Sequence, residues 1–166
     1  RRISVNPQTM QQKTLNLIGR KHTVEQTVEA FRMARKIGFD NINMDLIIGL
    51  PGEDENDFSD TLRQIKELNP DSLTIHSLVV KRASRLRSVL DEEEKKNACK
   101  TDGVLSENDK AAVMEKMLEI GQRFAKSEGY EPYYMYRQKN SAGHFGSSGQ
   151  ENIGYGQFYL KSIDVV

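Results

Sequence analysis

Polar side chains occupy alternate positions of the apolar segment Asn41–Ile48. Successive side chains of a strand point to opposite faces, so Asn43, Asp45 and Ile47 are predicted to share one face. The other face would carry apolar side chains only, namely Ile42, Met44, Leu46 and Ile48. Because burying an unpaired carboxylate is costly, Asp45 either has an internal partner or faces a ligand cavity.

Two neighbouring segments offer side chains of the same kind. Asn6 and Gln8 follow the first strand-like segment, and Thr74 and His76 alternate with apolar residues in Ser72–Leu78. In parallel sheets and barrels, ligands bind beyond the carboxyl ends of the strands. Taken singly, each of these side chains is more often structural than functional. Together they favour a shared cavity lined by three consecutive strands.

Several familiar chemistries are excluded. The turn Gly-Leu-Pro-Gly (49–52) lacks the Lys-Ser/Thr pair of a phosphate-binding loop and the spacing of the dinucleotide fingerprint. The chain has no nucleophile elbow, and its three histidines lack metal-ligand spacing. Its single cysteine, Cys99, excludes a Cys-cluster metal site and a disulfide within the chain. We therefore assign no metal ligands, and any strong chemistry would have to come from a bound cofactor.

The elements that position these residues are predicted to alternate between strand and helix. A short strand over Arg2–Asn6 ends at Pro7, and Thr9 is expected to cap a short helix. Thr23 and Gln26 match a capping box before a helix with a buried stripe. That stripe comprises Val24, Val28, Phe31, Ala34 and Ile37. Such alternation is typical of βα units around a parallel sheet.

A second group of elements lies further along the chain. Asp54 is predicted to cap the helix that follows the turn, and Ser106 with Asp109 opens the longest helix. That helix carries a Met-rich stripe typical of core packing. Two aromatic segments, 130–136 and 153–160, flank a Gly/Ser-rich stretch and are predicted to pair as antiparallel strands.

Composition indicates a soluble globular chain. Of 166 residues, 37% are hydrophobic and 29% are charged, with 24 basic and 24 acidic side chains. The resulting formal charge of zero gives no argument for nucleic acid or an anionic membrane as a partner. The chain has no apolar stretch of membrane-spanning length, and a cytoplasmic location is expected. It starts at Arg1 without an initiator Met, so we interpret it as a fragment of a longer protein.

Five motifs occur in a specific order. They are Arg-Ile-Ser-Val-Asn-Pro-Gln-Thr-Met (2–10), Ile-Gly-Arg-Lys-His-Thr (18–23), Asn-Ile-Asn-Met-Asp-Leu-Ile-Ile-Gly-Leu-Pro-Gly-Glu (41–53), Leu-Asn-Pro-Asp-Ser-Leu-Thr-Ile-His-Ser-Leu (68–78) and Tyr-Tyr-Met-Tyr-Arg-Gln-Lys-Asn (133–140). Each is weak alone. Together they resemble the radical S-adenosylmethionine (SAM) enzymes of the oxygen-independent coproporphyrinogen III oxidase family, especially its coproporphyrinogen dehydrogenase branch.

The resemblance implies an α/β fold, a parallel (β/α) half-barrel that is part of a six-stranded partial TIM-type barrel. The chain would be the C-terminal half of such an enzyme. Residues 1–90 would hold roughly the fourth to sixth barrel strands, and residues 91–105 a charged surface excursion. Residues 106–166 would form a C-terminal helix and an antiparallel strand extension of the same domain.

The family's cofactor-binding positions transfer to five residues of this sequence. Gln8 and Asp45 would hydrogen-bond the ribose and amino-acid parts of SAM, and Arg20 would pair with its carboxylate. Ile47 would pack on the adenine, and Val79 would line the same pocket. The resemblance assigns no catalytic residue.

This chain also departs from the family. The Cys-x-x-x-Cys-x-x-Cys loop that holds the four-iron–four-sulfur cluster is absent, as are the first three strands. We therefore expect the chain alone to be inert. In the longer protein the resemblance implies oxidative decarboxylation of two propionates of coproporphyrinogen III, giving protoporphyrinogen IX in haem synthesis. Its partners would be that porphyrinogen or a related porphyrin and an electron donor, with neither nucleic acid nor membrane.

Three other functions stay open. Relatives of the family keep the barrel but bind haem as chaperones. Another radical SAM enzyme could act on a different substrate, such as an RNA base, although the neutral charge is mild evidence against it. The third possibility is a stable α/β fragment without activity.

Overall fold

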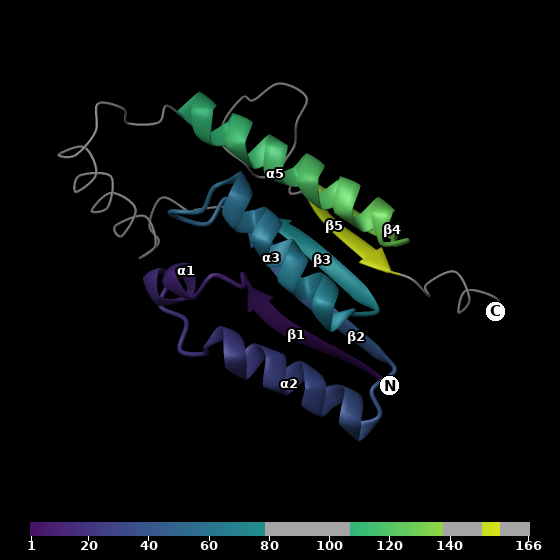
Figure 1. The fold of residues 1–166 in the computed structure, drawn as a ribbon. Coiled ribbons are helices and arrows are strands. Elements are labelled where there is room, and N and C mark those ends of the chain that lie inside the picture. The colour runs from purple at the N-terminus through teal and green to yellow at the C-terminus, as the bar shows by residue number, and fades with distance from the viewer. Residues whose placement is uncertain (79–106, 138–150, 157–166) are drawn as a thin grey trace.

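The computed structural model describes residues 1–78, 107–137 and 151–156, which form one mixed five-stranded sheet with helices (Figure 1). The strand order is β1-β2-β3-β5-β4. Strands β1, β2 and β3 pair in parallel, whereas β5 runs antiparallel to both β3 and β4. The bounds are β1 Arg2–Gln8, β2 Asn41–Ile48, β3 Ser72–Ser77, β4 Glu131–Arg137 and β5 Glu151–Gly156. The predicted α/β fold, with its parallel strands and antiparallel extension, is confirmed, and the described sheet is open.

Three long helices pack on one face of this sheet (Figure 1). They are α2 Val24–Ile37, α3 Glu55–Leu68 and α5 Glu107–Ser127. The short helix α1, Gln12–Leu17, lies next to the carboxyl end of β1. No helix of the described segments covers the opposite face (Figure 1).

The core lies between the sheet and the three helices. The apolar half of β2 is fully buried, as the alternation predicts, with Ile42, Met44, Leu46 and Ile48 all at 0% exposure. Burial of each such side chain stabilises the fold by about 1.5–3 kcal/mol. From the helices, Phe58, Ile65 and Met117 join the same cluster, which confirms the core role of the Met-rich stripe.

Local hydrogen bonds start two helices where the sequence predicts. The Thr23 hydroxyl accepts from the Gln26 backbone N–H at 3.2 Å, and the Gln26 side chain accepts from the Thr23 N–H at 3.0 Å. Asp54 caps α3 in the same way, through the N–H groups of Asn56 and Asp57. Both capping predictions are confirmed, and each such cap is worth about 1 kcal/mol.

Three local predictions are wrong. Strand β1 continues through Pro7 to Gln8, because a register shift between Val5 and Gln8 accommodates a residue without an N–H. Thr9 does not cap α1, whose N-cap is Gln11 and has no side-chain cap bond. Ile37 is 66% exposed. It is six residues after Phe31, and at about 100° per residue this is about 600°, equivalent to about 240°, so Ile37 faces away from the core.

Candidate functional site

Polar side chains gather on the sheet face opposite the helices. The strand register pairs Ser4 with Asn43, Asp45 with Thr74, and Ile47 with His76. Residues paired in parallel strands point to the same side of the sheet, so these side chains gather on one face. We call this group the polar face; its members are Ser4, Asn6, Asn43, Asp45, Thr74 and His76.

Asn43 is the centre of the polar face. Its Nδ2 donates to Asp45 Oδ1 at 2.7 Å and to Ser4 Oγ at 3.0 Å, and its Oδ1 accepts from Thr74 Oγ1 at 3.1 Å. The side chain is buried, with only 4% of its surface exposed. One amide therefore links β1, β2 and β3 and fixes the orientation of the Asp45 carboxylate.

Asp45 has internal partners and also remains open to solvent. Ser4 Oγ lies 3.3 Å from Asp45 Oδ2, on the carboxylate oxygen that Asn43 does not use. About a fifth of the Asp45 side chain is exposed, at 21%. His76 Nε2 lies 4.0 Å from Asp45 Oδ1, and 40% of its side chain is exposed. A carboxylate can accept about four hydrogen bonds, so Asp45 keeps capacity for a ligand.

Gln8 ends β1 in an unusual conformation. Its φ of 68° lies in the left-handed region, which is rare for a residue other than Gly, Asn or Asp. The residue is only 8% exposed and is paired with Leu46, the neighbour of Asp45 in β2. Within the described residues its side-chain amide has no hydrogen-bond partner. Binding of a ligand by this amide at the carboxyl end of β1 stays a prediction.

The remaining predicted cofactor residues have different surroundings. Ile47 is half-buried and belongs to the same face as Asp45. Arg20 is exposed in the connection from α1 to α2, which lies at the carboxyl end of β1 (Figure 1). Within the described segments its guanidinium forms no ion pair. Val79 lies outside the described residues.

A buried hydroxyl and a carboxylate form a second polar group, which the sequence reasoning missed. Thr9 Oγ1 donates to Glu53 Oε1 at 2.6 Å, and Thr9 is only 1% exposed. Burial raises the pKa of Glu53, while the bond from Thr9 opposes that shift. Ser4 was also missed, although its spacing of two from Asn6 places both on one strand face.

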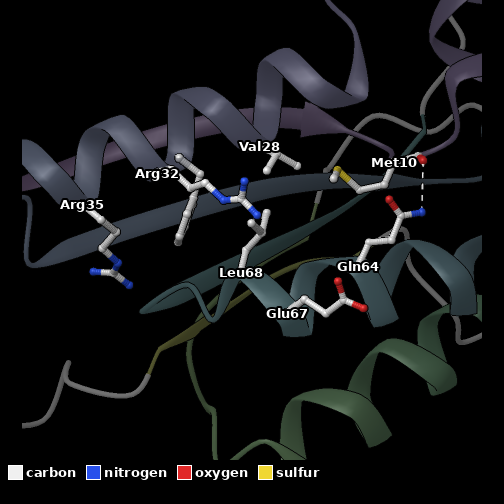
Figure 2. A pocket seen from close by; sticks show the side chains of 8 residues that line it. Met10, Val28, Arg32, Arg35, Gln64, Glu67 and Leu68 are labelled. Carbon is white, nitrogen blue, oxygen red and sulfur yellow. Dashed lines mark hydrogen bonds between the residues drawn. The ribbon is translucent and has the colours of Figure 1, made fainter.

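The described residues also form a surface pocket of about 400 Å³ between α2 and α3 (Figure 2). Met10, Phe31 and Leu68 supply apolar lining, and Arg32 and Arg35 also line the pocket. Arg35 forms an ion pair with Asp71, in which Arg35 Nη1 lies 2.6 Å from Asp71 Oδ2. Because the pocket lies on the helical side, it is separate from the polar face. Nothing in its lining resembles a chemically active group.

No three His, Cys, Asp or Glu side chains among the described residues are grouped to hold a metal ion. In the same part of the chain, no helix is long and apolar enough to cross a membrane.

Comparisons with known proteins identify a family model and several similar proteins. Residues 1–65 match the family model described as the radical SAM superfamily. The chain is 43% identical over 154 residues to the oxygen-independent coproporphyrinogen-III oxidase-like protein HemZ of Bacillus subtilis, covering 93% of this chain and 27% of HemZ. It is also 34% identical over 79 residues to the heme chaperone HemW of Bacillus subtilis, covering 48% of this chain and 21% of HemW.

A solved structure confirms the fold. Coproporphyrinogen III oxidase (HemN) from Escherichia coli, described as a radical SAM enzyme, superposes with a TM-score of 0.61 at 24% identity. The superposition covers 78% of this chain and 27% of that structure. The chain thus spans about a quarter, or less, of the length of the relatives it matches.

Proposed function

We propose that this chain forms a SAM-binding part of a protein that oxidises coproporphyrinogen III. Its first 65 residues match the model of the radical SAM superfamily. The observation that carries the proposal is the partly open Asp45 carboxylate beside Ile47 on a sheet face that no described helix covers. The 43% identity to a coproporphyrinogen-III oxidase-like protein supports the substrate class.

The residues present fit SAM. Asp45 is held by Asn43 and still has lone pairs available, as a ligand hydroxyl or ammonium group requires. The Gln8 amide is unpartnered among the described residues, and the exposed Arg20 can pair with a carboxylate. Ile47 offers an apolar surface for the adenine, and Val79, which lies outside the described residues, is a further proposed contact. When bound, SAM supplies the radical chemistry, and these side chains bind and orient it.

The same residues do not fit an iron–sulfur cluster. Such clusters are held by several cysteine thiolates, and this chain has one cysteine, Cys99. The cluster ligands would therefore come from residues outside this sequence, and the chain by itself would bind SAM without cleaving it.

In the longer protein, the proposed reaction is oxidative decarboxylation of two propionates to vinyl groups, giving protoporphyrinogen IX. The tetracarboxylate substrate requires cations, for which Lys81, Arg82, Arg137 and Lys139 are our candidates. Lys81, Arg82 and Lys139 lie outside the described residues, and Arg137 ends β4. An electron donor and a cytoplasmic location complete the proposal.

Equilibrium dialysis of the 166-residue chain against SAM tests the cofactor part. We expect Asp45→Ala to weaken binding about tenfold or more, because it removes a charge-assisted contact. Asp40→Ala is the matched control, since Asp40 is a highly exposed carboxylate beside the amino end of β2. Equal affinities of the wild type and Asp45→Ala would refute the assignment of Asp45.

A chimaera tests the reaction. It would join this chain to the remainder of the HemZ relative, which would have to supply the cluster ligands, and 5′-deoxyadenosine and vinyl products would be assayed anaerobically. Formation of both that depends on coproporphyrinogen III supports the proposal. Cleavage of SAM at the same rate with and without coproporphyrinogen III would support the radical chemistry and contradict the proposed substrate.

A haem chaperone is the second candidate, favoured by the 34% identity to HemW. The two functions differ in one observable. Stoichiometric haem binding by the chimaera, without porphyrinogen turnover, would support the chaperone and contradict the oxidase.

A further inference from the structure

The loop that follows β1 is bound to α3 by side-chain hydrogen bonds. Met10 N–H donates to Thr61 Oγ1 at 3.3 Å. Gln64 Nε2 donates to Met10 O at 3.3 Å, as Figure 2 shows. Gln11 Nε2 donates to Asp60 Oδ2 at 2.9 Å. These bonds connect residues about fifty positions apart, so the loop is fixed by tertiary contacts instead of by its own sequence.

The hydrogen bonds of this network run in one direction, from donor to acceptor. Thr9 Oγ1 has one proton, which goes to the Glu53 carboxylate at 2.6 Å. Thr9 Oγ1 lies 3.3 Å from Thr61 Oγ1, so Thr61 must be the donor of that pair. Thr9 Oγ1 also accepts from Gln11 N–H at 3.1 Å. The chain of donors from Met10, Thr61 and Thr9 therefore ends at Glu53, its terminal acceptor.

Glu53 also joins two strand ends. It belongs to the turn after β2, where its N–H donates to Leu50 O at 3.2 Å. Thr9 follows directly after β1. The bond from Thr9 to Glu53 thus sets the position of the carboxyl end of β1 relative to that of β2, which carries Asp45 and Ile47.

Gln8 is the residue that needs this restraint. A left-handed backbone at such a residue costs about 1–3 kcal/mol and persists only where the surrounding structure holds it. The residue immediately after Gln8 is Thr9, which is buried and bonded to Glu53. Without that bond, the backbone at Gln8 would relax and move its amide.

We propose that Glu53 is a positioning residue of the cofactor site, which holds Gln8 in its left-handed conformation through Thr9. The part of this inference that concerns the ligand rests on the proposed function. Glu53 itself need not contact SAM.

Amide hydrogen exchange tests the restraint without any ligand. We expect Glu53→Ala to speed exchange of the Met10 and Gln11 amides about tenfold, because the network loses its terminal acceptor. Glu53→Gln keeps an acceptor oxygen and should preserve protection. Glu55→Ala is the matched control, because that carboxylate pairs with Lys116 on α5 and is not bonded to the loop. Thr9→Val, which removes the donor, should reproduce the effect of Glu53→Ala, and Thr9→Ser should not.

Equilibrium dialysis of the same variants against SAM tests the consequence. We expect about tenfold weaker binding for Glu53→Ala and rescue by Glu53→Gln. Unchanged exchange in both Glu53→Ala and Thr9→Val overturns the inference, and so does faster exchange with unchanged affinity. A wild-type chain that fails to bind SAM contradicts the proposed function instead, and the exchange rates still decide whether Glu53 restrains the loop.

Discussion

At the scale of single residues, Asn43 contacts side chains on three strands although it is almost completely buried. Such an amide costs free energy to bury and is stable only with its partners in place. Its position here restrains Asp45, so the structural and functional interpretations of these polar residues are not alternatives. The buried amide is the support, and the partly open carboxylate beside it is the group available to a ligand.

Substitution of Asn43 by Leu should destabilise the fold by about 1–3 kcal/mol, because Asp45 and Thr74 each lose a partner. Urea unfolding at neutral pH measures the change. Asn56→Ala, at an exposed position of α3, is the control and should change the free energy of unfolding by less than about 0.5 kcal/mol. A stability equal to the wild type would show that the network adds nothing to folding.

Glu53 gives the protein a specific dependence of stability on pH. Burial raises the pKa of the Glu53 carboxyl in the folded state above 4.5, its ordinary value in the unfolded state. At a pH between the unfolded-state pKa and the folded-state pKa, the folded state therefore binds more protons than the unfolded state. The contribution of Glu53 to the free energy of unfolding therefore falls as the pH rises through this window. Glu53→Gln lacks this titration and should gain stability relative to wild type as the pH rises from 4.5 to 7.5. Urea unfolding across that range checks it, and a constant difference would contradict the assignment.

At the scale of elements, the sequence predicts what is local and misses what is distant. The capping boxes at Thr23 and Asp54 were predictable because donor and acceptor lie three residues apart. Thr9 has the same residue type in a similar context, yet its hydroxyl donates to Glu53, 44 positions away. A tertiary partner outcompetes a local one here, and nothing in the sequence near Thr9 reveals it.

Helix α5 approaches the sheet closely at Gly121. A Cβ added there would lie 2.6 Å from Ile75 Cδ1 and 3.6 Å from Phe58 Cε1. Although Ala has the higher helix propensity, this contact should make Gly121→Ala net destabilising by about 1–3 kcal/mol. Thermal or urea unfolding measures the loss. Adding Ile75→Val, which removes the contacting methyl, should make the two changes less costly together than their sum, whereas strict additivity would contradict the proposed contact.

At the scale of the whole molecule, the parallel part of the sheet was predictable and the antiparallel part only in outline. Alternating strand and helix patterns with short turns leave few arrangements for β1, β2 and β3. The placement of β5 between β3 and β4 depends on pairing between segments roughly eighty residues apart, which no local pattern encodes. The candidate site is likewise only partly predictable from the sequence pattern. The alternation of side chains along β2 groups Asp45 with Ile47, whereas the assignment of Arg20 and Val79 to the site rests on the resemblance alone.

The open sheet predicts self-association. Among the described strands, β1 pairs only with β2, so its other edge has free backbone donors and acceptors. Near that edge, α2 exposes Met33 at 61% and Ile37 at 66%, which are one helical turn apart on the same side. Together these features form an apolar margin that another chain can cover.

We therefore expect the average mass in light scattering to rise with protein concentration. The double substitution Met33→Lys and Ile37→Lys should lower that rise, because it places charge on the apolar margin. Ala112→Lys with Gln122→Lys is the matched control, since it adds the same charge at exposed positions of α5. A wild-type chain that stays monomeric at high concentration would contradict the prediction. Association that survives the α2 substitutions would instead assign it to an edge of the sheet, at β1 or at β4.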